Sequence, residues 1–230
     1  SAHPNALYTV GKFSTKLIAA NTERGTLLKT NLLMPQVSLH DAEFSVDSTS
    51  CLLKASMTAD TTFRKFRVEE LALTLDNASV TADGYAEIMS KEEIYTDINL
   101  QLHSPQLEQI LALAPQSVLK QLKGNRLKGA IQANASAKGF FNGKEKFPVV
   151  NVDLNLSKIV GYAPDRDAKL DRLDLQLNGR YNPNSKDSTY VKIDDFYIKT
   201  GRSNLRAKAD AHYKKGKEYV NATVKGMVDL

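Results

Sequence analysis

Tryptophan is absent from the 230 residues, and cysteine occurs only once, at Cys51. A single cysteine excludes an internal disulfide and any metal site built from several cysteines. Its apolar neighbours in the stretch TSCLLKA favour a small buried side chain over a reactive thiol. No apolar run approaches the roughly 20 residues that a membrane-spanning helix needs. These absences remove disulfide scaffolds and helical membrane spans from the classes to consider.

Motifs of catalysis and of metal binding are also missing. The stretch GNRLKG at 124–129 lacks the Ser or Thr of a phosphate-binding loop, and there is no G-x-S-x-G stretch. Two acid pairs, Glu69/Glu70 and Asp194/Asp195, occupy the same place in a repeated pattern, which favours a repeated turn or strand-entry role over a catalytic pair. No histidine is close enough to another for a helical zinc pair, since the four are His3, His40, His103 and His212. We therefore expect no enzyme, no metal and no cofactor.

The formal charge of +5 is concentrated toward the end of the chain. From Val191 onward there are nine basic residues against five acids. Such an end suits an anionic membrane surface or a nucleic acid. Most of these residues, however, occupy alternate positions of predicted strands, where a charged side chain faces water. The sequence favours a solvated strand face, and we expect no nucleic-acid partner.

Alternation of apolar and polar residues with a period of two dominates the chain and predicts half-buried strands. Turn signals such as DNAS, YNPNSKDS, TGRS and KKGK separate the alternating runs. Short turns predict antiparallel neighbours, since parallel strands need long crossover connections. The clearest runs lie at 71–75, 80–88, 98–102, 127–137, 150–156, 173–179, 205–211 and 220–228.

One segment, 104–122, follows helical spacing instead. Ser104 is placed to cap a helix, Pro105 suits the first helical position, and Gly124 suits the end. Pro115 is expected to divide the segment into two short helices. The sequence therefore predicts one amphipathic helical insert between two sheet-forming halves.

A pattern of one apolar residue, two acids, an apolar triplet, a polar turn and a small-residue run occurs twice. The two copies are Val68–Ala86 and Ile193–Ala211, and Leu39–Ala55 fits the same template less well. We interpret these copies as strand–turn–strand units of a sheet that grows by repetition, near 37–60, 66–103 and 191–230. We expect a single elongated β domain over 1–230, cut from a longer protein.

The segment Gly161–Ala211, with its GYAP stretch and alternating leucines, resembles the C-terminal region of AsmA-like proteins of Gram-negative envelopes. The segment Ile98–Pro115 resembles the same family's helical interruption. This resemblance implies a long, twisted antiparallel sheet curled into an apolar groove. It also implies a periplasmic protein whose parent is anchored in the inner membrane by an N-terminal helix, with a role in outer-membrane lipid homeostasis.

Three functions stay open on these grounds. The first is a non-enzymatic groove that handles phospholipid or another acyl lipid, the second an envelope scaffold that binds partner proteins through edge strands, and the third an unrecognised enzyme or polyanion binder. Rows of small residues such as Ala133–Ala137 leave room for a lipid tail, or let a helix or second sheet pack closely. The candidate groove lining is Leu71, Leu73, Leu75, Ile98, Leu100, Leu102, Leu154, Leu156, Leu173, Leu175, Leu177, Ala207 and Ala209.

Overall fold

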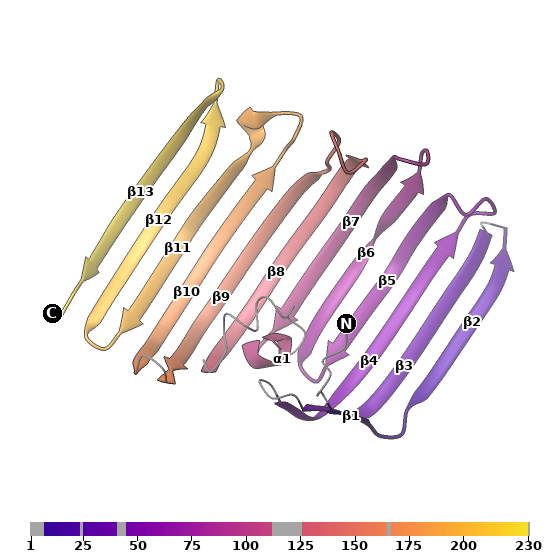
Figure 1. The fold of residues 1–230 in the computed structure, drawn as a ribbon, viewed down its shortest axis with the longest axis horizontal. Helices are drawn as coiled ribbons and strands as arrows, with labels where there is room; N and C mark the ends of the chain where they lie inside the picture. The colour runs from indigo at the N-terminus through magenta and orange to yellow at the C-terminus, as the bar shows by residue number, and fades with distance from the viewer. Residues whose placement is uncertain (1–6, 24, 41–44, 112–125, 165–166, 230) are drawn as a thin grey trace.

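The computed structural model describes residues 7–23, 25–40, 45–111, 126–164 and 167–229. These residues form one antiparallel sheet of 13 strands and a single short helix (Figure 1). The sheet does not close on itself, and its strands lie side by side in one layer. The predicted class, an all-β antiparallel sheet with one helical insert, is confirmed, and the arrangement is consistent with a curled sheet.

The strands are long and follow the predicted alternation closely. The helix α1 spans Leu107–Leu111, and a short 3-10 turn spans Lys186–Ser188. The strands are β1 (Leu7–Val10), β2 (Ser14–Thr22), β3 (Gly25–His40), β4 (Ser45–Ala59), β5 (Lys65–Leu75), β6 (Ala78–Ile88), β7 (Ile94–Ser104), β8 (Arg126–Phe141), β9 (Val149–Ala163), β10 (Ala168–Tyr181), β11 (Tyr190–Thr200), β12 (Ser203–Lys214) and β13 (Lys217–Met227).

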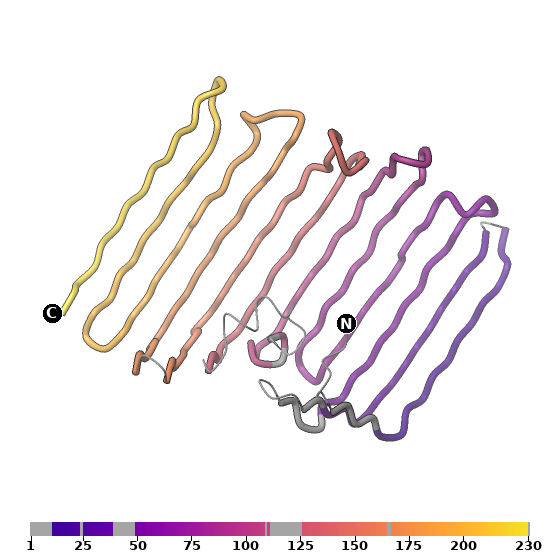
Figure 2. The backbone as a smooth tube through the Cα atoms, viewed as in Figure 1, coloured from indigo at the N-terminus to yellow at the C-terminus, as the bar shows by residue number. Residues whose placement is uncertain are grey.

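From β3 to β13 the spatial order of the strands is their order in the chain. The backbone runs up and down as a meander, which Figure 2 follows from indigo to yellow. Only the start departs from this path, because β1 and β2 both pair with β3, at different parts of its length. Two edges result among the described strands, one formed by β2 with β1 and the other by β13.

Both acid pairs lie at β-bulges in the middle of strands. Glu69 and Glu70 together face Asp83 alone, since Val68 pairs with Gly84 and Leu71 pairs with Ala82. On β11 the residues Asp194 and Asp195 face Lys208 alone in the same way. The prediction of a turn or strand-entry role was wrong. Because each bulge adds one residue, the apolar residues on either side of the acid pair lie on the same face although they are three positions apart in the chain. The bulge explains why two acids follow one apolar residue in both copies of the repeat.

The third copy of the repeat differs from the other two. The template predicts a turn between Val46 and Cys51, but β4 runs through both without a break. Cys51 pairs with Met34 on one side and Leu75 on the other, and Thr49 and Val46 also pair with β3, although the register against β3 shifts on both sides of Thr49. The residues read as a turn, DSTS, contain neither Gly nor Pro, and β-branched Thr49 suits a strand.

The helical insert begins later than predicted. Ser104 is the last residue of β7 and is fully buried, and its hydroxyl oxygen accepts the Gln106 N–H at 3.2 Å and donates to the Gln106 carbonyl at 2.6 Å. Ser104 therefore closes a local turn, and Pro105 precedes α1 by two residues. The predicted second helix beyond Pro115 lies outside the described residues. No helix in the described ranges is long and apolar enough to cross a membrane.

Very little of this sheet is buried. The accessible surface is 15615 Å², whereas a compact monomer of 25.4 kDa exposes about 10,000 Å². Among the described apolar residues only five are buried, namely Cys51, Ala59, Ala78, Leu107 and Ile159. A one-layer sheet has no second layer to form a core, so both of its faces stay open.

The Asp60 carboxylate organises the turn between β4 and β5. One of its oxygens accepts the backbone N–H groups of Arg64 and Lys65 at 2.8 and 3.0 Å, and the other accepts the Thr62 hydroxyl at 2.6 Å. The Lys65 N–H and then the Thr62 hydroxyl hold the pKa of Asp60 below its ordinary value of 3.8.

This lowered pKa makes the stabilisation by Asp60 depend on pH. A folded-state pKa below the unfolded one gives stability that is present above the unfolded pKa and is lost as pH falls through the folded pKa. We expect Asp60→Asn to lower the unfolding midpoint in urea at pH 7 and to change it little below the folded-state pKa. Measurement of the urea midpoint of both proteins from pH 7 into the acid range checks this. An equal decrease of the midpoint by Asp60→Asn at pH 7 and at the lowest pH would contradict it.

Candidate apolar binding face

All thirteen candidate residues lie on one face of the sheet, which we call the apolar face. The cross-strand pairs establish this, because directly opposed residues of neighbouring strands point to the same side. One row runs Leu73, Val80, Leu102, Ala133, Leu154, Leu177, Ile193, Ala209, Ala222 across β5 to β13. The sequence-predicted lining residues are thus brought together in one continuous surface.

The small residues on this face alternate with large ones from neighbouring strands. Ala82 lies between Leu71 and Leu100, and Ala135 lies between Leu100 and Val152. On β12 the residue Ala207 lies between Phe196 and Val224. The alanine-rich strands β6, β8 and β12 therefore present smaller side chains on this face than the leucine-, valine- and phenylalanine-bearing strands beside them.

Nothing in the described part of the chain covers most of this face. Leu71, Ile98 and Leu100 keep 41%, 40% and 44% of their surface exposed, and none of the thirteen candidates is buried. Of the described elements outside the sheet, α1 contacts β7 and β8, and the short 3-10 turn contacts β10 and β12. Close packing by a second sheet, one of the two readings of the alanine rows, is not found within the described ranges.

The apolar face extends beyond the residues predicted from the sequence. On one side it continues through Leu53, Leu32 and Leu17 of β4, β3 and β2. On the other side it ends with Val220 and Val224 of β13, which are 73% and 59% exposed. The extension over β2 to β4 could have been predicted from the sequence, because Leu28, Thr30, Leu32 and Met34 occupy alternate positions of β3.

The opposite face is polar and carries its own side-chain network. Asn151 donates to the Ser136 hydroxyl oxygen at 3.0 Å, and Arg180 donates to the Asn151 side-chain oxygen at 3.2 Å. Lys138 and Asp97 form an ion pair at 2.7 Å, and hydrogen bonding to Asp97 raises the pKa of Lys138. These groups pair with one another across neighbouring strands of the polar face.

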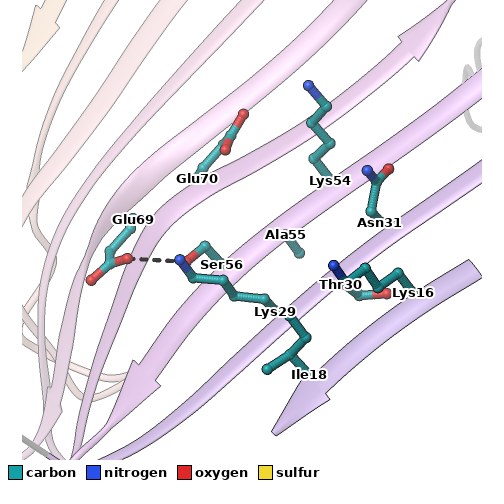
Figure 3. A pocket seen from close by; sticks show the side chains of 10 residues that line it. All are labelled: Lys16, Ile18, Lys29, Thr30, Asn31, Lys54, Ala55, Ser56, Glu69 and Glu70. Carbon is teal, nitrogen blue, oxygen red and sulfur yellow. Dashed lines mark hydrogen bonds between the residues drawn. The ribbon is translucent and has the colours of Figure 1, made fainter. Parts of the chain in front are cut away.

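One depression on the polar face, about 400 Å³ in volume, lies over β2 to β5, and Figure 3 shows the side chains that line it. Lys16, Lys29 and Lys54 line it together with Glu69 and Glu70. All five of these side chains are exposed, and Ser56 donates to Glu69 at 3.0 Å. Mixed, solvated charges of this kind describe an ordinary hydrophilic surface.

The two carboxylates of the Asp194/Asp195 pair have separate partners. Asp194 accepts a hydrogen bond from Asn178 at 2.6 Å and pairs with Lys192 at 2.5 Å, and Lys192 lowers the pKa of Asp194. Asp195 instead pairs with Arg206 at 3.4 Å. In the described ranges no group of three or more His, Cys, Asp or Glu side chains is arranged to hold a metal ion.

Comparison of the chain with known protein families, with curated proteins and with solved structures finds no match. The open apolar face is the feature of the structure that bears on function.

Proposed function

We propose that the protein binds acyl chains of phospholipid or a related lipid on the apolar face, without catalysing a reaction. The observation that carries the proposal is the exposure of a continuous apolar surface across β2 to β13. Contiguous apolar patches larger than a few hundred Å² are rare on soluble monomers unless something binds there.

The mechanism is partition from water into an apolar trough. Each methylene group of a lipid tail that leaves water contributes about 0.8 kcal/mol. In this proposal a tail lies along the small side chains of β6, β8 and β12, between the larger side chains of the flanking strands. No covalent step, metal or cofactor enters this process.

The resemblance of Gly161–Ala211 to AsmA-like proteins supports the same function and suggests its setting. On that basis we propose the periplasm of a Gram-negative envelope as the compartment, with a parent protein anchored in the inner membrane and lipid movement between membranes as the role. Docking of envelope proteins on an edge strand is the second candidate function, and the exposed edge of β13 favours it.

A matched pair of substitutions tests the proposal. Leu100 and Gln101 are neighbours on β7, but Leu100 lies on the apolar face and Gln101 on the polar face. We expect Leu100→Glu to reduce phospholipid capture from mixed phosphatidylethanolamine and phosphatidylglycerol vesicles at least tenfold, because a carboxylate strongly opposes acyl-chain burial.

Gln101→Glu adds the same carboxyl group on the other face and should leave capture unchanged. Native mass spectrometry of the protein after separation from the vesicles measures the bound lipid. Equal capture by both variants and the unmodified chain would contradict binding on the apolar face.

A further inference from the structure

Among the described strands, β13 forms an edge of the sheet along its whole length. Its eleven residues are all exposed, and it pairs with β12 in one unbroken register from Lys217 to Met227. It carries neither proline nor bulge, two of the devices that prevent edge strands from pairing with another chain, and its charged residues are Lys217, Glu218 and Lys225.

The turn before β13 determines which of its backbone groups point outward. Lys215 and Gly216 both have positive φ, 50° and 72°, as in a two-residue type I′ hairpin. Lys214 and Lys217 therefore form a hydrogen-bonded pair, and such pairs recur at every second residue along the ladder. The odd-numbered residues of β13 bond to β12, and the even-numbered residues, 218 to 226, direct their N–H and C=O groups to the free edge.

The residue order of β13 is complementary to itself about Ala222, the centre of the strand. In antiparallel pairing about that residue, Val220 of one copy faces Val224 of the other, and Ala222 faces Ala222. Tyr219 then faces Lys225, Lys217 faces Met227 and Glu218 faces Gly226, so that no two like charges are directly opposed. The even-numbered residues of both copies meet in this register, as the hydrogen bonding requires.

We propose that two copies of this chain pair through their β13 edges about Ala222 and form a closed, two-fold dimer. The seam joins the two apolar faces into one, because Val220, Ala222 and Val224 lie on that face in each copy. The other edge is less suited to such pairing because it is divided between two strands. These are β2, which has nine residues and begins at Ser14, and the short strand β1.

Cysteine cross-linking tests both the partner and the register. In the proposed seam, opposed Cα atoms are about 5.5 Å apart, within the range for a disulfide. We expect Ala222→Cys to form a disulfide-linked dimer readily under mild oxidation, at least tenfold faster than Val220→Cys or Val224→Cys alone. Mixing the Val220→Cys and Val224→Cys chains should give the cross-linked heterodimer.

The unmodified chain, which contains only buried Cys51, is the control for background oxidation. Sedimentation velocity should show this chain as a dimer at micromolar concentration, and Ala222→Pro, which removes an outward N–H group, as a monomer with an unchanged circular dichroism spectrum. Equal cross-linking of the three single variants, a monomeric chain, or assemblies that keep growing with concentration would overturn the proposal. Because no lipid is needed, the outcome is independent of acyl-chain binding.

Discussion

Ile159→Ala is expected to lower the free energy of unfolding by about 3 kcal/mol, the typical cost of truncating a buried isoleucine. Ile159 is 3% exposed and packs directly over Gly129, where an added Cβ would lie 2.6 Å from the Ile159 Cδ1 atom. A cavity at this point cannot be filled easily, since Gly129 has no side chain to move into it.

The same substitution at Ile98 is the matched comparison. Ile98 also lies on the apolar face but is 40% exposed, so Ile98→Ala should cost less than about 1.5 kcal/mol. Urea unfolding followed by circular dichroism measures both values. Similar, large losses for the two variants would mean that another layer covers Ile98 in solution, which contradicts an open apolar face.

The double variant Ala207→Trp with Ala209→Trp is expected to fold, with a melting temperature within a few degrees of the unmodified chain. In a closed core two such enlargements would cause severe overpacking, typically 1–3 kcal/mol for even modest additions. Ala207 and Ala209 are instead half-exposed on β12, with no described element above them.

The folded double variant should also bind less phospholipid, because two indole rings would fill the space above the small residues of β12, between β11 and β13. Thermal unfolding and lipid capture on the same preparation check the two parts. Aggregation or loss of the β-sheet signal in this variant, with the single variants also misfolded, would place these alanines in a closed core.

The strand positions and the apolar face could be predicted from the sequence because a period of two assigns every second residue to one side. Leu71, Leu100 and Leu154 belong to runs of this kind and do share a face. The acid pairs could not be interpreted correctly in this way, since Glu69 and Asp194 are the extra residues of bulges, where the period of two fails.

The limits of β4 and of the helical insert depended on tertiary context. Thr49 and Ser50 lie within β4. The Thr49 hydroxyl and the Ser50 N–H both donate to the carboxylate of Asp76, which lies in the turn between β5 and β6. The sequence around Thr49 contains no sign of that distant partner. The alternation of apolar and polar residues also does not predict what contacts the apolar face. A strand that faces lipid and a strand that faces a protein layer have the same pattern.

The absence of tryptophan from the natural chain provides the most direct test of acyl-chain binding. A single tryptophan introduced at Ala209 would lie on the apolar face, and one at the neighbouring residue Lys208 on the polar face. Both variants would be mixed with phospholipid that carries bromine on its acyl chains, which quenches indole fluorescence on contact. We expect strong quenching for Ala209→Trp and little for Lys208→Trp. Equal quenching of the two variants, or no quenching of either, would contradict acyl-chain binding on the apolar face.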